Sequence, residues 1–475
     1  MSAEKININN KIDKNNFKLG YMHFCGIGGI GMSAIAQVMH QNGFKVQGSD
    51  KSESFIVQSM LNMGIKIFPL QKESNLHGVS CLVYSSAINL ETNEEILAAK
   101  KLNIPIIHRS VALGFIMEDY ISIAISGSHG KTTTTSLLGF ILDKCGFNPI
   151  IISGGIMNEY NSNYKIGNGK YIVVEADESD GSFVNFSSNY SLITNIDREH
   201  IDYYKSIEEI ENIFQVLADK SDTCAVCYDD ERLQKISSKT ESAILKYGIN
   251  DCVDYRIDLN TIKYQGGYSY FNVITKEKTY NIKAKLFGIH NIKNITGAFM
   301  LAKKLGCEDV ILLDAISKFT GVKRRFTHVG TFNDALIIDD YAHHPTEIKA
   351  VISAALDIKS NTNMQNGRII VVFQPHRYSR VYDLMEEFTK CFYGIDNLII
   401  NPIYAAGEEN IHNIKLEDLS ILVQKNILTI DIRIANLEHV RCNLAVMNLC
   451  KDDIVIFMGA GDITKFAYST CDVLL

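Results

Sequence analysis

The octapeptide SGSHGKTT occupies residues 126–133, in the middle of the chain. The apolar run ISIAI precedes it at residues 121–125, and a helix-like stretch follows over residues 134–142. A strand, a glycine turn and a helix in this order direct backbone N–H groups and a helix N-terminus at a polyphosphate. We therefore predict a nucleotide-binding parallel sheet, in which Lys131 reaches the terminal phosphates and the hydroxyl of Thr132 ligates Mg²⁺.

Length and composition are those of an ordinary globular protein. A chain of 475 residues exceeds what one core can organise, and we expect roughly three domains. The formal net charge of −7 argues against a nucleic acid partner. No apolar run approaches the length of about 18 residues that crosses a bilayer, so we expect no membrane partner. The eleven cysteines show no framework spacing, which predicts reduced thiols and a cytoplasmic location. For the oligomeric state we expect a monomer or a homodimer.

Three units follow one another along the chain. Apolar strand candidates alternate with helical stretches from residue 18 to about residue 117, which predicts a parallel doubly wound sheet. The second unit contains the phosphate loop and a β-rich insertion at residues 254–284, where Gly266-Gly267 predicts a hairpin turn. The alternation of strands and helices resumes after Arg325. We expect an α/β protein with a disordered arm at 1–18, a Rossmann-like domain at 19–118, a P-loop ATPase-like parallel sheet at 119–325 and a C-terminal Rossmann-like domain at 326–475.

A second glycine-rich turn lies near the N-terminus. Residues 26–31 read GIGGIG after the strand candidate at 21–25, and Asp50 ends the next strand. Glycines at this spacing let the backbone approach a diphosphate. The residues leave three alternatives open: NAD with Asp50 on a ribose, another nucleotide diphosphate such as a UDP-sugar, or a structural turn. Ser85 and Ser86 end a later strand, where ligands of α/β sheets bind.

Acidic and histidine residues follow two further strand candidates. Glu175 ends an apolar strand in the same unit as the phosphate loop and offers the hard oxygen ligand that Mg²⁺ on ATP requires. His200 lies in the stretch NIDREHID, residues 195–202, and is a candidate second metal ligand or positioning group. Taken singly, Glu175 could equally belong to a solvated acidic turn, and His200 could equally be an ordinary surface histidine.

Two polar stretches lie at a helix start and at a domain junction. The stretch GIHNIKN, residues 288–294, could hydrogen-bond the edge of adenine or merely cap a helix. The stretch GVKRRF, residues 321–326, places cations where they could contact the γ-phosphate, or where they could form a solvated linker.

The third unit carries two polar loops after neighbouring strands. The stretches DDYAHHPTE, residues 339–347, and QPHRYSR, residues 374–380, both follow strand candidates. Carboxyl ends of parallel strands share one rim of a sheet, so we expect the two loops to lie together. Two arginines with histidine and tyrosine on one rim would hold an anionic carboxylate.

Taken in order, eight stretches resemble the Mur ligase family, from about residue 17 to the C-terminus. The glycine loop followed by Met-Ser, and the QPHRYSR stretch, are similar to the alanine-adding branch of that family. The eight stretches are GIGGIGMSAIA from Gly26, SGSHGKTTTT from Ser126, EADESDGSF from Glu175, TNIDREHIDYY from Thr194, GIHNIKN from Gly288, FTGVKRRF from Phe319, DDYAHHPTE from Asp339 and QPHRYSR from Gln374.

The resemblance implies that the first domain binds the UDP moiety of a sugar, the second binds ATP and the third binds the incoming amino acid. It implies ATP and Mg²⁺ (or Mn²⁺) as cofactors, and UDP-N-acetylmuramate and L-alanine as substrates. The implied UDP-sugar residues are Gly26, Gly28, Gly29, Gly31, Asp50, Ser85 and Ser86. The implied ATP residues are Gly127, Ser128, His129, Gly130, Lys131, Thr132, Thr133, His290, Asn291, Asn294 and Arg325. The implied metal ligands are Thr132, Glu175 and His200. The implied amino-acid and acyl residues are Asp339, His343, His344, Arg377, Tyr378 and Arg380.

The implied chemistry joins a carboxylate to an amine, which is the first peptide step of cytoplasmic peptidoglycan precursor synthesis. A carboxylate is a poor electrophile, so the hypothesis is phosphoryl transfer from ATP to the lactyl carboxylate and attack of L-alanine on the acyl phosphate. Mg²⁺, Lys131 and Arg325 would act by positioning and charge neutralisation. A base must take the ammonium proton, and His200 and His344 are both candidates.

Three rival functions remain. A dehydrogenase would use only the first glycine loop, and a nucleotide switch would use only the Lys-Thr loop. A related ligase, which adds a peptide in cell-wall recycling or glutamate to folate, would use the same parts with other substrates.

Overall fold

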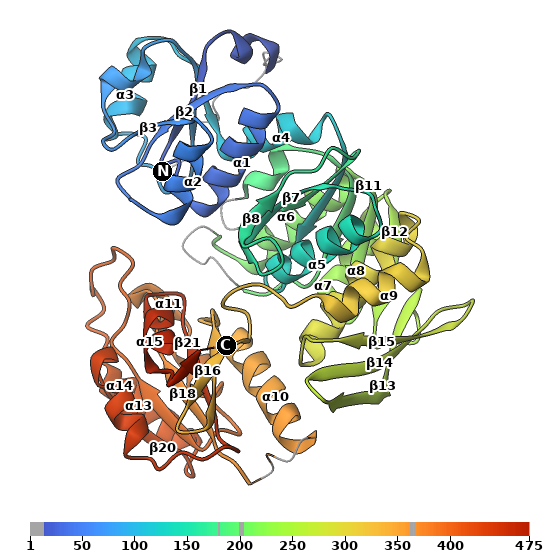
Figure 1. The fold of residues 1–475 in the computed structure, drawn as a ribbon, viewed down its shortest axis with the longest axis vertical. Coiled ribbons are helices and arrows are strands. Elements are labelled where there is room, and N and C mark those ends of the chain that lie inside the picture. The colour runs from blue at the N-terminus through green and yellow to red at the C-terminus, as the bar shows by residue number, and fades with distance from the viewer. Residues whose placement is uncertain (1–13, 179–180, 199–203, 362–363, 365, 475) are drawn as a thin grey trace. The chain divides into compact units, whose positions relative to one another are not determined.

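The structure is a computed structural model that describes residues 14–178, 181–198, 204–361, 364 and 366–474 (Figure 1). Its chain divides into two compact units, residues 1–246 and 247–475, and each is described by itself. The prediction of a disordered arm needs a correction at its end. Phe17 is buried and its ring lies 5.9 Å from that of Phe115, which holds η1(Lys14–Leu19) as a 3₁₀ helix. The rest of that arm, residues 1–13, lies outside the described residues.

Unit 1 begins with the predicted doubly wound sheet. Its five parallel strands run in the order β3-β2-β1-β4-β5. The strand order reverses between β1 and β4, because β2 and β3 are added on one side of β1 and β4 and β5 on the other, and crevices of α/β sheets form at such a switch point. The strands are β1(Tyr21–Cys25), β2(Lys45–Ser49), β3(Lys66–Phe68), β4(Val79–Tyr84) and β5(Ile106–His108). The helices are α1(Ile30–Gln41), α2(Phe55–Asn62), η2(Glu73–Leu76), α3(Glu94–Lys101) and α4(Arg109–Met117).

A second sheet of unit 1 carries the phosphate loop. Its strands run in the order β11-β10-β6-β9-β7-β8, and all of these pairs are parallel except β7 with β8. The apolar stretch predicted as a strand is β6, and the helix after it begins three residues earlier than predicted. The strands are β6(Ile121–Ser126), β7(Ile150–Met157), β8(Ser162–Lys165), β9(Tyr171–Glu175), β10(Ser188–Ile193) and β11(Ser221–Cys227). The helices are α5(Lys131–Lys144), η3(Ser182–Asn185), α6(Ile207–Asp219) and α7(Glu231–Lys239).

Unit 2 opens with the predicted β-rich insertion. Strands β13 and β14 pair antiparallel across Gly266 and Gly267, which have φ values of 58° and 76°. Positive φ at both turn residues is the geometry that a two-residue hairpin requires, so the predicted hairpin is confirmed. The stretch at 288–294, predicted to lie at a helix start, contains the first turn of the helix that follows the insertion. The elements are β12(Ala243–Gly248), which spans the unit boundary, β13(Tyr255–Gln265), β14(Tyr268–Ile274), β15(Thr279–Ala284), α8(Ile289–Lys304) and α9(Asp309–Lys318).

The C-terminal sheet of unit 2 has seven strands in the order β20-β19-β18-β21-β17-β16-β22. The five strands from β20 to β17 are parallel, so their carboxyl ends form one rim. The strands are β16(Thr327–Phe332), β17(Ala335–Asp340), β18(Ile369–Phe373), β19(Asn397–Ile400), β20(Asp431–Ile434), β21(Ile454–Met458) and β22(Val473–Leu474). The helices are α10(Pro345–Asn361), α11(Tyr378–Asp383), α12(Met385–Phe388), α13(Leu416–Asn426), η4(Leu437–His439), α14(Val440–Ala445) and α15(Ile463–Thr470).

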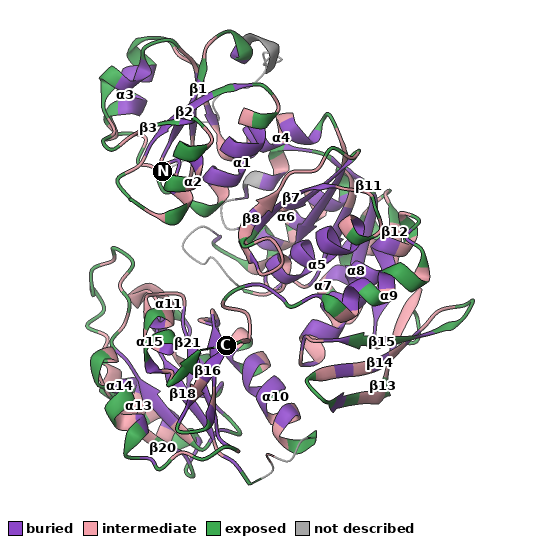
Figure 2. Cartoon of the chain, viewed as in Figure 1, coloured by how far each residue is buried: buried purple, intermediate pink, exposed green. Residues whose placement is uncertain are grey.

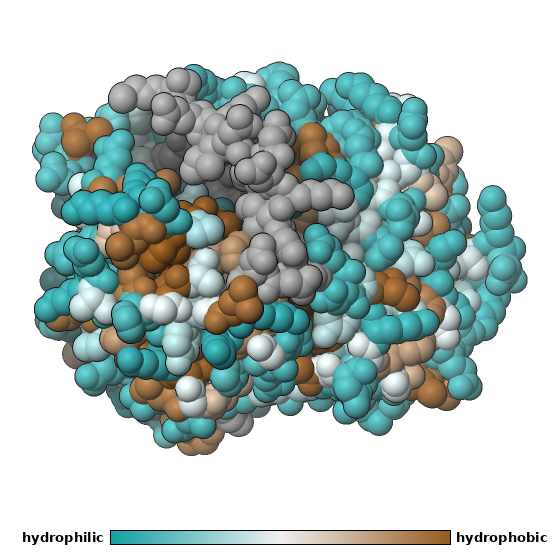
Figure 3. Space-filling view, turned by 90° about the horizontal axis from the view of Figure 1, so that it is seen from above, coloured by the Kyte–Doolittle hydropathy of each residue, from teal (hydrophilic) through white to brown (hydrophobic). Residues whose placement is uncertain are grey.

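Many of the buried residues lie in the strands of the sheets. The central parallel strands are largely buried, as the purple arrows in Figure 2 show, and β18 and β21 are buried at every residue, whereas the edge strands β3 and β20 are not. Such continuous burial is expected for strands covered by helices on both sides. On the face drawn in Figure 3, hydrophilic residues predominate and hydrophobic residues form smaller groups among them. In the described part of the chain, every helix is too short or too polar to span a bilayer.

Candidate functional site

The phosphate loop joins β6 to α5 through two glycines with positive φ. Gly127 has φ 131° and Gly130 has φ 85°, both in the region that side chains with a Cβ rarely adopt. A Cβ on Gly127 would lie 2.1 Å from Oγ1 of Thr194 and 3.0 Å from its backbone nitrogen. Glycine is therefore required at this position because the end of β10 comes so close to the loop.

The loop is braced by residues that follow β10. The hydroxyl of Thr194 donates to the carbonyl of His129 at 2.6 Å, and Nδ2 of Asn195 donates to the same carbonyl at 2.9 Å. In return the backbone N–H of His129 donates to Oδ1 of Asn195 at 2.9 Å. Nε2 of His129 lies 3.2 Å from Oδ2 of Asp197. These bonds fix the loop backbone before any ligand binds, which is the preorganisation that phosphate binding needs.

Lys131 forms a buried ion pair at the start of α5. Its ammonium lies 2.7 Å from Oε2 of Glu178, whose side chain is only 2% exposed, and donates to the carbonyl of Gly127 at 2.7 Å. The sequence analysis did not single out Glu178 as a site residue. The sequence feature that could have indicated Glu178 is its position three residues after Glu175. A buried lysine needs a counter-charge, and Glu178 supplies it to Lys131.

Thr132 and Glu175 are neighbours across the sheet. Strand β9 pairs with β6 in a register that sets Glu175 beside Ile125, just before the loop. The hydroxyl of Thr132 donates to Oε1 of Glu175 at 3.0 Å, and the backbone N–H of Gly154 donates to Oε2 at 2.6 Å. Burial raises the pKa of Glu175, and the positive charge of Lys131 opposes this shift.

This donor set fits a magnesium ion. A hydroxyl and a carboxylate are the hard oxygen ligands that Mg²⁺ prefers, and a buried carboxylate with a raised pKa is one that a nearby cation would stabilise. The third predicted ligand, His200, lies outside the described residues.

The N-terminal glycine loop lies at the switch point between β1 and β4. Asp50 braces it, because the backbone N–H of Gly28 donates to Oδ2 of Asp50 at 2.8 Å. Asp50 therefore contacts the glycine loop directly. Ser85 and Ser86 follow β4 on the same rim, and the hydroxyl of Ser86 lies 3.1 Å from Nε2 of His108.

A cavity opens on this rim of the sheet. It has a volume of about 450 Å³ and its lining includes Lys51, Lys72, Ala87 and Ile88. Lys51 and Lys72 contribute positive charge to this cavity, and Glu94 contributes a carboxylate. Of the other predicted sugar-nucleotide residues, Gly26 starts the loop with φ 75°, Gly29 is the N-cap of α1, and Gly31 lies in its first turn.

The predicted adenine residues lie at the start of α8 in unit 2. Nδ2 of Asn291 donates to the carbonyl of Phe287 at 2.8 Å, and Nδ2 of Asn294 lies 3.4 Å from Oδ1 of Asn291. Both asparagines are buried, and His290 lies between Gly288, the N-cap, and Asn291. A role at adenine stays a prediction.

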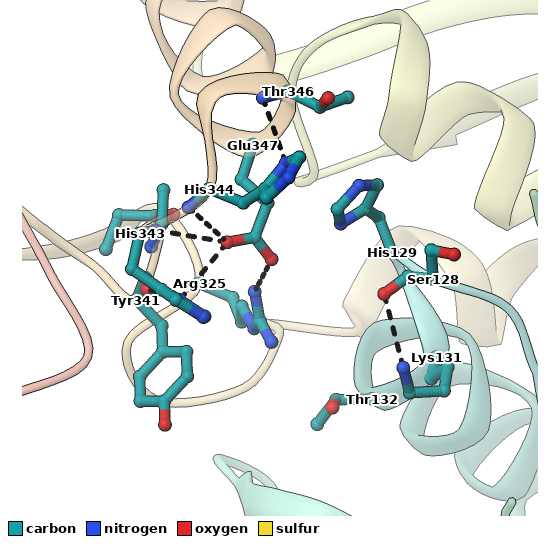
Figure 4. Close-up of polar contacts among 12 residues, drawn as sticks. Ser128, His129, Lys131, Thr132, Arg325, Tyr341, His343, His344, Thr346 and Glu347 are labelled. Carbon is teal, nitrogen blue, oxygen red and sulfur yellow. Dashed lines mark hydrogen bonds and ion pairs between the residues drawn. The ribbon is translucent and has the colours of Figure 1, made fainter. Parts of the chain in front are cut away.

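Glu347 organises the predicted catalytic residues of unit 2. It lies in the first turn of α10, and Figure 4 shows its carboxylate contacted by Arg325, His343 and His344. Nη1 of Arg325 lies 3.5 Å from Oε1, and the backbone N–H groups of His343 and His344 donate to Oε2 at 3.1 Å and 3.3 Å. The sequence analysis missed this role of Glu347, although it quoted the stretch that contains it.

The two histidines before α10 differ in their surroundings. Nδ1 of His343 lies 2.9 Å from the carbonyl of Tyr341, and burial lowers the pKa of His343 to about 3. The backbone N–H of Thr346 donates to Nδ1 of His344 at 3.3 Å. A neutral His344 ring therefore carries its proton on Nε2.

Two aspartates end β17. Asp339 accepts a hydrogen bond from Thr464 at 2.5 Å and lies near Arg324, and burial raises its pKa. Asp340 accepts from the backbone N–H of Phe326 at 2.7 Å, which ties the junction segment to the strand. Burial raises the pKa of Asp340 to about 6.

The loop after β18 places Arg377, Tyr378 and Arg380 at the start of α11. Arg377 has φ 69° and ψ 133°, a conformation that residues other than glycine avoid. His376 stacks on Tyr404, with ring centroids 5.5 Å apart and an interplanar angle of 8°, and lies 5.7 Å from the ring of His343. The predicted neighbourhood of the loops after β17 and β18 is therefore found in unit 2.

These two units present a phosphate loop with a paired lysine and a rim of histidine and arginine side chains, which are the parts of an ATP-dependent ligase. Comparison with known proteins gives the family. Residues 21–121 match the Mur ligase family catalytic domain, residues 125–302 the Mur ligase middle domain, and residues 324–461 the Mur ligase glutamate ligase domain. The chain belongs to the Mur ligase family and has its three-domain architecture, whereas the residue boundaries predicted from the sequence remain a prediction.

Individual relatives are similar over nearly the whole chain. The chain is 38% identical to the UDP-N-acetylmuramate--L-alanine ligase of Brucella ovis, over 95% of this chain and 96% of that protein. It is also 38% identical to the enzyme of the same name from Bartonella bacilliformis, over 95% of both chains. The crystal structure of UDP-N-acetylmuramate-alanine ligase from Thermotoga maritima superposes with a TM-score of 0.78 at 27% identity, covering 95% of this chain and 98% of that one.

Proposed function

We propose that this protein is an ATP-dependent ligase that joins L-alanine to the lactyl carboxylate of UDP-N-acetylmuramate through an acyl phosphate. The observation that carries the proposal is the 38% identity, over 95% of the chain, to curated relatives of that name. The reaction is the first peptide step of peptidoglycan precursor synthesis. It belongs in the cytoplasm, and through the cell wall it serves cell shape and cell division.

Lys131 and the backbone of residues 127–133 bind the triphosphate of ATP in this proposal. Support comes from the preorganised loop and from the position of the lysine ammonium, 2.7 Å from the carbonyl of Gly127. His290, Asn291 and Asn294 contact adenine or its near surroundings. Arg325 offsets charge on the transferred phosphoryl group, because two anions must meet for the reaction to occur.

Thr132, Glu175 and His200 hold the divalent ion, Mg²⁺ or Mn²⁺. When bound, this ion offsets negative charge on the phosphate oxygens. Thr132 and Glu175 support the assignment because their oxygen atoms lie 3.0 Å apart, where the first turn of α5 meets the end of β9. Glu175 keeps the bond from the backbone of Gly154 that orients its carboxylate.

The sugar nucleotide binds at the switch point of the N-terminal sheet. The backbone of Gly26, Gly28, Gly29 and Gly31 contacts the diphosphate, and the cavity of about 450 Å³ with Lys51 and Lys72 in its lining is large enough for part of the nucleotide. In that arrangement Asp50 orients the loop as well as contacting the ligand. Ser85 and Ser86 supply hydroxyl groups on the same rim.

The amino acid and the acyl group bind at the rim of the C-terminal sheet. Arg377 and Arg380 hold carboxylate groups there, with Tyr378, Asp339 and His343 around them. Since burial lowers the pKa of His343 to about 3, this ring is neutral at physiological pH and acts as a hydrogen-bonding group. His344 donates from Nε2, because the backbone N–H of Thr346 occupies its Nδ1. His200 and His344 are both candidates for the base that takes the ammonium proton.

A phosphate-release assay tests the function. With ATP, UDP-N-acetylmuramate and L-alanine together we expect sustained release, and with any one of the three omitted we expect release near background. Glycine, serine, glutamate and a tripeptide in place of L-alanine probe the choice of amine. Faster release with glutamate or with the tripeptide would contradict the proposed substrate and would favour a related ligase. Size-exclusion chromatography with light scattering distinguishes a monomer from a homodimer.

A further inference from the structure

The loop after β19 contacts the loop that carries Arg377. The backbone N–H of Tyr404 donates to the carbonyl of Pro375 at 2.8 Å, and the backbone N–H of Arg377 donates to the carbonyl of Tyr404 at 2.9 Å. These two bonds form a short parallel bridge between His376 and Tyr404. The loop that carries Arg377 is therefore held in part by a segment about 30 residues further along the chain.

One carboxylate completes this contact. Glu408 follows a turn in which Ala406 and Gly407 have φ values of 51° and 88°. Its Oε1 accepts from Nε of Arg377 at 2.5 Å and from the hydroxyl of Ser379 at 2.8 Å. Its Oε2 accepts from the backbone N–H of Ser379 at 3.0 Å, which is one of the donors that the first turn of α11 leaves without a helical partner.

The contact is charged and partly buried. The side chain of Glu408 is 20% exposed and that of Arg377 is 35% exposed. Burial opposes ionisation of Glu408, but the bonds from Ser379 and Arg377 outweigh it, and the pKa of the carboxyl is lowered. Glu408 is thus ionised at neutral pH and engages Nε, one of the two edges through which a guanidinium binds a carboxylate.

Arg377 adopts a backbone conformation that costs free energy. With φ 69° and ψ 133° it lies where side chains with a Cβ are strained, and such residues persist only when their surroundings hold them. The surroundings here are the bridge to Tyr404 and the bonds to Glu408. A strained arginine held at the rim of a sheet, beside His376, is a feature expected of a ligand-binding residue rather than of a structural one.

We propose that Glu408 is a positioning residue for the amino-acid side of the ligase site. It fixes both the guanidinium of Arg377 and the start of α11, so that Arg377 is set in place before the substrate carboxylate arrives. The inference rests on the proposed function, in which Arg377 binds a carboxylate. Preorganisation of this kind is expressed mainly in the affinity for the group that Arg377 holds.

The test compares Glu408→Gln with Glu409→Gln, a control at the next residue, which is exposed. We expect Glu408→Gln to raise KM for L-alanine about tenfold while KM for ATP stays within about twofold of its original value. Glu409→Gln should change neither constant. If Arg377→Ala and the double variant Arg377→Ala/Glu408→Gln have the same KM for L-alanine, Glu408 acts through Arg377. Independent effects of the two substitutions would overturn the proposal.

A purely structural role gives a different result. The proposal would be overturned if Glu408→Gln lowered the thermal stability and changed kcat and the KM values of all substrates together. In that case Glu408→Asp would restore little of the KM for L-alanine. A nitrogen-15 NMR signal from Nε–H of Arg377 gives a readout without substrates, and we expect its exchange with water to accelerate in Glu408→Gln. If the original protein shows no alanine-dependent turnover, the proposed function fails. The inference about Glu408 itself fails if this signal is unchanged in the variant.

Discussion

The ammonium of Lys131 lies 2.7 Å from the carboxylate of Glu178, and both groups are largely withdrawn from water. A lysine in a phosphate loop must exchange its protein partner for phosphate oxygen when the nucleotide binds. Glu178 therefore has two effects: it holds the lysine in place without ligand, and it competes with the triphosphate for that lysine. Removing the lysine should consequently affect stability as well as catalysis.

Lys131→Ala should reduce ATP turnover by more than about 10³-fold, because a phosphoryl transfer loses its positioning cation. UDP-sugar binding should be retained, because the N-terminal glycine loop is built from a separate sheet. Stability should also fall, by about 3 kcal/mol, since Glu178 becomes a buried carboxylate without its counter-charge. Urea unfolding of Lys131→Ala and of Lys131→Ala/Glu178→Gln separates the two effects. The double variant should regain most of the stability and none of the turnover, and turnover at the original rate in either variant would refute the loop assignment.

Glu175→Gln should increase the magnesium concentration needed for half-maximal turnover by about tenfold or more, because a neutral amide is a weaker ligand than a carboxylate. Glu231→Gln, in the first turn of α7, serves as a control and should leave the requirement unchanged. A titration of phosphate release with MgCl₂, repeated with MnCl₂, measures the effect. An unaltered requirement in Glu175→Gln would show that the ion is held elsewhere.

Gly127→Ala and Gly146→Ala form a matched pair of glycine substitutions. Both glycines have positive φ, 131° and 82°, so both variants bear backbone strain of about 1–3 kcal/mol. Only at Gly127 does the added Cβ collide with another residue, at 2.1 Å from Oγ1 of Thr194. Gly127→Ala should therefore lose nucleotide affinity by at least about tenfold, as calorimetry would measure, while Gly146→Ala keeps it. Equal nucleotide affinity in the two variants would contradict the claim that the close approach of β10 requires glycine at position 127.

His376→Gln tests the electrostatics of the C-terminal rim. Burial and the neighbouring Arg380 lower the pKa of His376 to about 4, below its unfolded value near 6.5. Between these values the unfolded chain binds a proton that the folded protein does not, so His376 makes stability fall as pH decreases from about 6.5 to about 4. Removing the imidazole should therefore reduce the loss of stability between pH 6.5 and pH 5 by about 1 kcal/mol. Chemical unfolding at the two pH values measures this, and an identical loss in the variant would show that the folded-state pKa is not lowered.

Much of the fold could be predicted because parallel strands covered on both faces are short apolar runs. The strands at 21–25 and 121–125 and the hairpin at Gly266-Gly267 agree with the structure. Strand β7 was not predicted because two glycines interrupt its apolar run, and β22 has only two residues. The start of α5 was predicted three residues late, since its Thr-rich first turn shows no apolar periodicity.

The candidate site was predictable only where the chemistry lies in contiguous residues. Lys131 and Thr132 open the helix directly after the glycine turn, and Glu175 ends an apolar strand, so the pattern indicates both their type and their place. Glu178, Glu347 and Glu408 act as partners of cations that lie 47, 22 and 31 residues away along the chain. Spacing in a sequence does not disclose such pairs, because the register between distant segments is set by tertiary packing.

A crystal structure with a non-hydrolysable ATP analogue and magnesium tests the central claim most directly. We predict that the β- and γ-phosphates lie against the backbone of residues 127–132, with the ammonium of Lys131 bound to phosphate oxygen and the metal ligated by Thr132 Oγ1 and the carboxylate of Glu175. A triphosphate bound at any other place in the protein, with Lys131 still paired to Glu178, would contradict the account.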